Sequence, residues 1–162
     1  MQFLYPWIVL VHVLAAFGFA LAHGVSAFAA FRIRAERERD RVVLLLDLSR
    51  WTAGLMYTSL LVLVLAGVGA GVLGGWFGQA WIWAAIGVLV GVSVAMLAVA
   101  SPYYARVRVA VGQQPYGRGP APEPASAAEL AVLLDSRRPH VIAAIGVVGL
   151  ALLLWLMVVK PF

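Results

Sequence analysis

Histidine supplies the side chains of this sequence that are best suited to bind a metal ion or a haem iron. The chain has three histidines and no cysteine, so thiolate metal sites, cysteine nucleophiles and disulfides are excluded. His12 and His23 lie in one long apolar run. Over their separation of eleven residues a helix turns about 1,100° and rises about 16.5 Å. The two imidazoles therefore point the same way at different depths, and they are too far apart to share one metal ion.

Haem b is one ligand that these imidazoles suggest, because its iron takes axial ligands from facing helices. The third histidine is His140, and the pair that matches best in depth is His23 with His140. His12 would use Met157 as a partner or leave the iron five-coordinate. Haem binding by His12, His23 or His140 is therefore one hypothesis. The alternative is that these side chains are hydrogen-bonded groups of a helical bundle.

Copper is the other ligand that the side chains suggest. Met56 and Met96 are expected at the same depth as His23, and thioether sulfur together with imidazole suits copper(I). Copper or other metal handling by His23, Met56 and Met96 is a further hypothesis. Methionine in a helix also serves simply as a packing group.

The elements that must position these side chains are membrane helices. A chain of 162 residues with 64% hydrophobic residues and a mean hydropathy of +0.96 is not a soluble domain. Charged residues are absent from 1–31, 51–105 and 139–159, and glycines near 74–78 divide the middle stretch. A run of about 20 apolar residues spans a bilayer. We predict a single all-α domain, a four-transmembrane-helix bundle with helices at about 5–31, 51–73, 80–101 and 139–159.

The arginines predict the orientation of the bundle. Eleven of the twelve basic residues lie in the predicted loops at about 32–50 and 102–138, and none lies in the short loop between the second and third spans. Basic loops stay on the cytoplasmic side, so we expect both termini outside. The chain has a net charge of +5, and we then expect its basic residues to face the lipid bilayer and not nucleic acid. A cleaved signal peptide is the alternative for the N-terminus, but no basic residue precedes the apolar run as that would require.

The two basic loops differ in composition. Residues 32–50 alternate acidic and basic side chains at helical spacing, which predicts a helical extension of the second span. Docking of acidic lipid headgroups is the alternative role of this segment. The other loop begins with a Pro- and Gly-rich linker. Ser126 and Glu129 then form a capping-box pattern, which predicts a short amphipathic helix at about 127–135, and Pro139 suits the first turn of the last span.

Glycine pairs on the second and third spans predict close helix packing. Gly67 with Gly71, and Gly87 with Gly91, lie about one turn apart, as small residues do where membrane helices touch. We expect the second and third helices to approach each other there, with homodimerisation through the same surfaces as the alternative. Residues 69–74 match the dinucleotide pattern G-x-G-x-x-G, but they lack the preceding strand and the following acid that this function requires.

Five segments carry a resemblance to known proteins. They are LVHVLAAFGFALAHG, FRIRAERERDRVVLLLDLSRW, GGWFGQAWIW, SPYYARVR and WLMVVKPF. Nearly the whole chain resembles a family of uncharacterised four-span bacterial integral membrane proteins, which implies a place in the bacterial cytoplasmic membrane. More distantly, the first-span histidine is similar to that of CopD copper-resistance domains and of HemJ-type haem-binding protoporphyrinogen oxidases, which implies haem binding at His12. The chain departs from the oxidase pattern at Arg32 and Arg34, where that pattern has a further histidine.

Acidic side chains are missing from all four predicted spans. Proton-coupled transporters use intramembrane carboxylates, and a serine hydrolase triad needs an acid to orient its base, so both functions are disfavoured. We therefore expect a small structural or accessory membrane protein whose partners are other membrane proteins or a second copy. A haem-b redox protein is the alternative, and copper handling is the third hypothesis.

Overall fold

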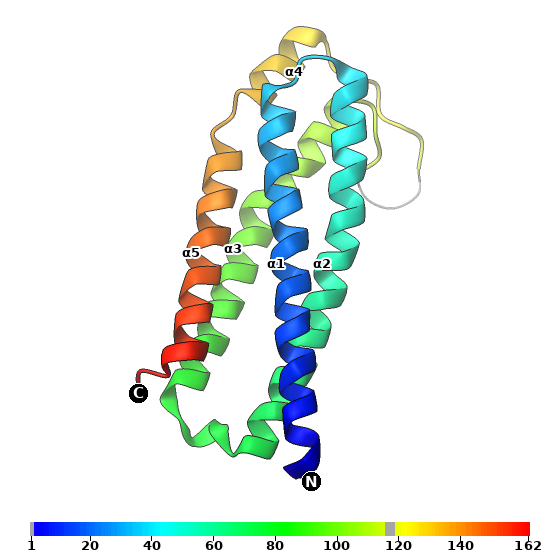
Figure 1. The fold of residues 1–162 in the computed structure, drawn as a ribbon. Coiled ribbons are helices and arrows are strands. Elements are labelled where there is room, and N and C mark those ends of the chain that lie inside the picture. The colour runs from blue at the N-terminus through cyan, green and yellow to red at the C-terminus, as the bar shows by residue number, and fades with distance from the viewer. Residues whose placement is uncertain (1, 116–118) are drawn as a thin grey trace.

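The chain forms a bundle of long helices in the computed structural model, which describes residues 2–115 and 119–162 (Figure 1). The elements in chain order are η1 (Gln2–Leu4), α1 (Tyr5–Ala35), α2 (Arg39–Gly74), η2 (Trp76–Gly78), α3 (Ala80–Ala110), α4 (Ala127–Leu134) and α5 (Arg138–Val159). The described residues contain no strand. The predicted all-α four-helix bundle is confirmed.

Four helical segments are long and apolar enough to cross a membrane, so the chain has the architecture of a multi-pass membrane protein. They are Gln2–Ala35, Arg39–Gly74, Ala80–Ala110 and Ala127–Val159, the last of which joins α4 to α5. Large apolar side chains line their outer faces, as Leu21 and Val158 do with 69% and 78% of their surfaces exposed. Lipid, unlike water, solvates such a surface, and a helix satisfies its own backbone there.

The helices extend beyond the predicted membrane spans at the basic loops. The expected helical extension before the second span is present, because α2 begins at Arg39 and only Glu36–Glu38 separate it from α1. Glu36 fixes this turn: its Oε1 accepts hydrogen bonds from the backbone N–H of Arg37 at 2.9 Å and of Glu38 at 3.1 Å. These donors, Glu38 first, hold the pKa of Glu36 below its usual value. Helix α3 likewise continues through Pro102 to Ala110.

The four long helices associate as two pairs. Helix α1 packs along α2, α3 packs along α5, and α1 also touches α5, while α2 and α3 hardly meet (Figure 1). The short turn between α1 and α2 explains the first pair, because short connections make antiparallel neighbours. Within the second pair, Gly149 of α5 lies against Val92 of α3.

The predicted close approach of the second and third helices is wrong. A Cβ at Gly67 would meet His12 of α1, and one at Gly71 would meet Phe77. A Cβ added at Gly87 or Gly91 on α3 would meet nothing within 4 Å. Gly67 is therefore covered by the hairpin partner α1 and Gly71 by η2, which the spacing of the glycines alone does not reveal.

The bundle has two distinct ends (Figure 1). The arginine-rich end holds the α1–α2 turn, α4 and the linker before it, and the termini end holds η1, η2 and the C-terminus. The largest apolar cluster lies at the arginine-rich end and includes Tyr103, Leu46 and Leu134, each fully buried. A smaller cluster around Trp81 and Leu156 lies at the termini end.

Helix α4 closes the arginine-rich end. The predicted capping box is confirmed, because Ser126 Oγ accepts from the backbone N–H of Glu129 and the Glu129 carboxylate accepts from the backbone N–H of Ser126. Leu130 and Leu134 are buried in the large cluster. Pro139 lies in the first turn of α5, as predicted.

Candidate functional site

His12 joins α1 to α2 through a backbone hydrogen bond. Its Nδ1 lies 2.9 Å from the carbonyl oxygen of Leu63, and its ring lies on Gly67, where an added Cβ would come within 3.0 Å of Cε1. A carbonyl oxygen only accepts, so Nδ1 must carry the proton. In the neutral imidazole the lone pair is then on Nε2. This is the tautomer in which histidine binds a metal through Nε2, with the other nitrogen held by a carbonyl.

His23 makes a different contact, on α5. A Cβ at Gly146 would collide with His23 Nε2 and lie 2.8 Å from Cε1, so only glycine leaves room for the imidazole there. The ring also stacks on Phe19 with centroids 6.1 Å apart. Among the described residues Nε2 is buried without a hydrogen-bond partner. This nitrogen is therefore enclosed where α1 packs on Gly146 of α5.

His140 lies at the edge of the bundle. It is exposed in the first turn of α5, and its ring meets Phe31 of α1 edge to face at 5.2 Å. His23 packs at Gly146, six residues further along α5, which corresponds to about 9 Å along the helix axis. The fold therefore does not bring His23 and His140 to one point, the arrangement that a shared iron would need.

The residues suggested for copper come from three helices. Met56 on α2 is half-buried, and Met96 on α3 packs against the large apolar cluster. His23 is on α1, against α5. Within 2–115 and 119–162, no group of three His, Cys, Asp or Glu side chains is arranged to hold a metal ion.

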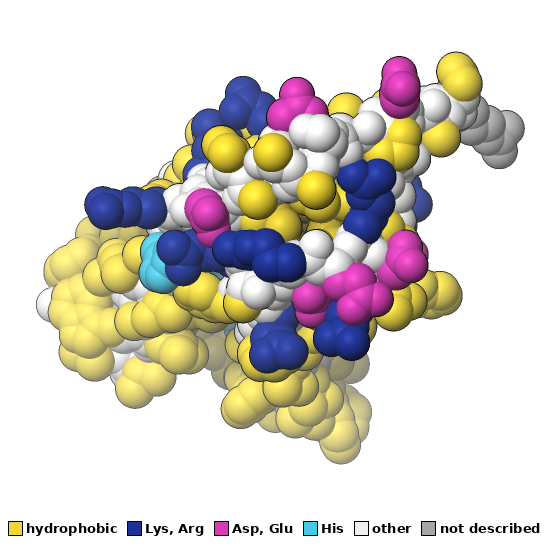
Figure 2. Space-filling model, turned by 90° about the horizontal axis from the view of Figure 1, so that it is seen from above, with side chains coloured by type: hydrophobic (Ala, Val, Ile, Leu, Met, Phe, Trp, Pro, Cys, Tyr) yellow, Lys and Arg dark blue, Asp and Glu magenta, His cyan; other side chains and the backbone are white. Residues whose placement is uncertain are grey.

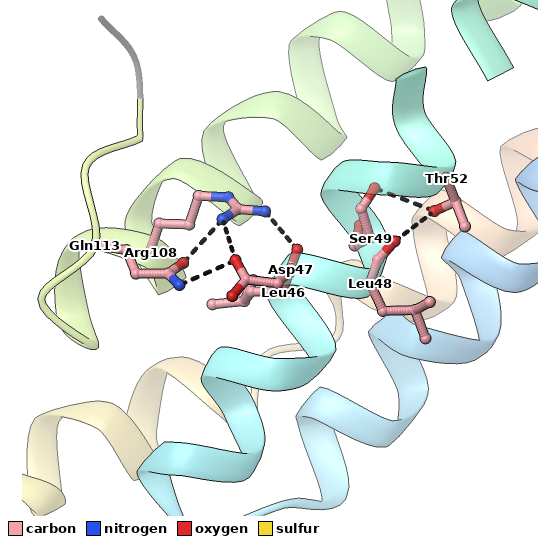
Figure 3. Close-up of polar contacts among 7 residues, drawn as sticks. All are labelled: Leu46, Asp47, Leu48, Ser49, Thr52, Arg108 and Gln113. Carbon is pink, nitrogen blue, oxygen red and sulfur yellow. Dashed lines mark hydrogen bonds and ion pairs between the residues drawn. The ribbon is translucent and has the colours of Figure 1, made fainter. Parts of the chain in front are cut away.

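A buried polar network that the sequence did not indicate lies at the arginine-rich end (Figure 3). Arg108 of α3 is only 7% exposed. It donates to the backbone carbonyl of Leu46 at 2.6 Å and to Gln113 Oε1 at 2.8 Å, and it lies 3.8 Å from Asp47 Oδ1. Gln113 in turn donates to Asp47 at 3.1 Å. These contacts join α2 to α3, the two helices that make little other contact.

The network was missed because Arg108 was counted among the basic residues of a loop. The signal that could have found it is the continued helical periodicity from 102 to 110, which carries Arg108 to the same buried face as Tyr103 and Val107. A second polar contact lies deeper, where Tyr104 donates to the backbone carbonyl of Ser26 at 3.2 Å. Ser26 and Ser49 hydroxyl oxygens are 3.5 Å apart.

The chemistry available inside the bundle is therefore that of imidazoles and hydroxyls. His12 retains one nitrogen with a lone pair, and His23 is enclosed by two helices. The Arg108 network is occupied by its own partners. The chain matches no family model, no curated protein and no solved structure.

Proposed function

We propose that this chain is a structural or accessory protein of the bacterial cytoplasmic membrane. The observation that carries the proposal is that both histidines of α1 pack on glycines of neighbouring helices, His12 at Gly67 and His23 at Gly146. Polar and small residues at helix contacts are what hold membrane helices together. The two imidazoles then serve to assemble α1 with α2 and with α5.

The proposed orientation places the arginine-rich end in the cytoplasm and both termini outside. It rests on the location of the basic side chains, since all of them except Lys160 belong to the α1–α2 turn region, the last turns of α3 and the segment up to Arg138. Basic segments next to membrane helices stay in the cytoplasm. A reporter fused after Phe162 should be active only outside the cytoplasm, and activity inside would contradict this orientation.

The packing role of His23 is tested with a double-mutant cycle. Gly146→Ala places a methyl group against the imidazole, and we expect it to lower the free energy of unfolding by about 1–3 kcal/mol, as overpacking does. His23→Ala removes the obstacle, so Gly146→Ala in that background should cost much less. The matched control is Gly91→Ala, which meets nothing and should be neutral or slightly stabilising. Additive effects of the two substitutions would contradict the proposal.

An accessory role also requires a surface for a partner helix. Gly87 and Gly91 lie one turn apart on α3, exposed and with nothing within 4 Å of an added Cβ, and such pairs let a second membrane helix approach closely. The partner on this face would be another membrane protein or a second copy. Because the chain has no cysteine, Val90→Cys reports contact by crosslinking, with Leu55→Cys on the exposed face of α2 as the control.

Haem binding through His12 is the second candidate function, and the hydrogen bond to Leu63 favours it. With Nδ1 holding the proton, His12 would hold the haem through Nε2, and the haem would supply redox chemistry when bound. Neither of two hollows on the surface, one along α1 and one between α3 and the linker, is lined by a histidine. His12 thus offers a nitrogen ligand for the iron, but neither hollow places a histidine where it would bind the porphyrin.

Absorption spectra separate these two functions. Protein purified after haem-supplemented expression should show no Soret band if His12 only joins α1 to α2. A Soret band that His12→Ala removes and His140→Ala retains would support the second candidate and contradict the first.

A further inference from the structure

A shallow hollow runs along the outer face of α1, on the side opposite α2. Its volume is about 460 Å³, and it is lined by Phe17, Ala20, Leu21, Gly24, Val25 and Phe28. Phe17 and Phe28 form its ends, and their separation of eleven residues corresponds to about 16.5 Å of helix. Gly24 lies in the middle, where an added Cβ would meet nothing within 4 Å. The hollow is therefore long, apolar and open to the lipid.

Basic side chains lie where the hollow reaches the arginine-rich end. Arg32 follows Phe28 by one helical turn on the same face of α1, and it is exposed. The preceding residue, Phe31, contacts the ring of His140 in the first turn of α5. Figure 2 shows Lys and Arg side chains at the edge of the apolar surface at this end of the bundle.

The arginines around this edge differ from those further out. Arg37 forms an ion pair with Asp135 at 2.7 Å, and Arg41 forms one with Glu38 at 2.8 Å. Among the described residues, Arg32 and Arg138 have no ion pair within 4.0 Å. The pKa of Glu36 is lowered first by the Glu38 N–H and last by Arg32, so the exposed Arg32 guanidinium interacts with that carboxylate only at long range and can also bind a group outside the chain.

We propose that an anionic phospholipid binds along α1. Its acyl chain lies in the hollow from Phe28 to Phe17, and its phosphate is held by Arg32. An apolar hollow along a membrane helix that ends at an exposed basic side chain matches a lipid with a charged headgroup. A soluble anion would contact the arginine but would not occupy the apolar hollow.

The test measures lipid binding to the purified full-length protein in detergent by native mass spectrometry. Phosphatidylglycerol is compared with phosphatidylcholine of the same acyl chains. We expect phosphatidylglycerol to bind the unaltered protein more tightly, and Arg32→Gln to weaken it about fivefold, which corresponds to the loss of one basic contact at a membrane surface. Arg50→Gln is the matched control, because Arg50 is also exposed and lacks an ion pair but lies on α2.

The hollow is tested separately from the charge. Gly24→Leu fills the hollow at a position where an added Cβ meets nothing within 4 Å, and it should weaken both lipids. Gly54→Leu is its control, since an added Cβ at Gly54 also meets nothing within 4 Å but lies on α2. The proposal is overturned if both lipids bind the unaltered protein equally, or if each variant behaves as its control does. It is also overturned if inorganic phosphate displaces phosphatidylglycerol, because the site would then recognise the anion alone.

Discussion

Different kinds of contact hold the helices together at the two ends of the bundle. At the arginine-rich end, the buried Arg108 donates to the backbone of α2 and is held in a network with Asp47 and Gln113. At the termini end, indole rings make the contacts. Trp76 donates to the Tyr5 hydroxyl at 3.1 Å, and the Lys160 ammonium lies 4.4 Å from the centroid of the Trp76 ring.

This difference shows how the two helix pairs are positioned relative to each other. A hydrogen bond from a guanidinium to one carbonyl fixes the register of α2 against α3, because its geometry is directional. Ring contacts tolerate sliding, and they suit the boundary region where tryptophan and tyrosine gather. We therefore expect the arginine-rich end to determine the arrangement of the pairs and the termini end to add stability without specifying it.

Removal of Arg108 should have the largest effect. Arg108→Ala deletes two hydrogen bonds from a charged donor, each contributing about 1.5–3 kcal/mol, so we expect the free energy of unfolding in mixed micelles to fall by about 4 kcal/mol. Amide hydrogen exchange should accelerate mainly where α2 and α3 meet. Arg106→Ala is the control, because Arg106 is exposed on the same helix and its loss should change stability little. If Arg108→Ala and Arg106→Ala lowered the free energy of unfolding equally, the proposed role of the arginine-rich end would be contradicted.

The termini end should respond less strongly and more locally. Trp81 is 5% exposed and belongs to the smaller apolar cluster, so Trp81→Ala should cost about 3 kcal/mol, near the lower limit for removal of a buried ring. Lipid or water at the boundary can refill part of the space. The faster hydrogen exchange should stay near η2 and the end of α5. Trp51→Ala, at a ring that is 82% exposed, is the control, and exchange that spreads to Arg108 would show that the ends are not independent.

The fold was predictable because the signals for membrane helices are long and strong. Charge-free stretches gave four spans, and the pattern of Ser126 and Glu129 gave a short helix that the structure has at Ala127–Leu134. The boundaries beside the charged segments were less accurate, because helices continue past the apolar stretch wherever ion pairs such as Arg41 with Glu38 support them.

It was much harder to predict from the sequence which helices contact each other. Gly67 has the same spacing to Gly71 as Gly87 has to Gly91, but the first pair is covered and the second is open to its surroundings. The periodicity of the sequence indicates which residues share a face of a helix. It does not indicate which other helix covers that face. For the same reason the two imidazoles of α1, predicted on one face, contact two different helices, and Arg108 was not recognised as buried.

The capping box of α4 gives the smallest effect and the sharpest test of how the arginine-rich end is closed. Ser126→Ala removes the acceptor of the Glu129 N–H and should cost about 1 kcal/mol, as the loss of a serine N-cap does. If α4 is only a cover, hydrogen exchange should increase in α4 while the exchange of α3 around Arg108 stays unchanged. If Leu130 and Leu134 are needed to keep Tyr103 and Leu46 buried, exchange should increase in α2 and α3 as well. Thr58→Ala on α2, where the exposed hydroxyl donates to the backbone carbonyl of Gly54 in the same helix, controls for the loss of a hydroxyl group.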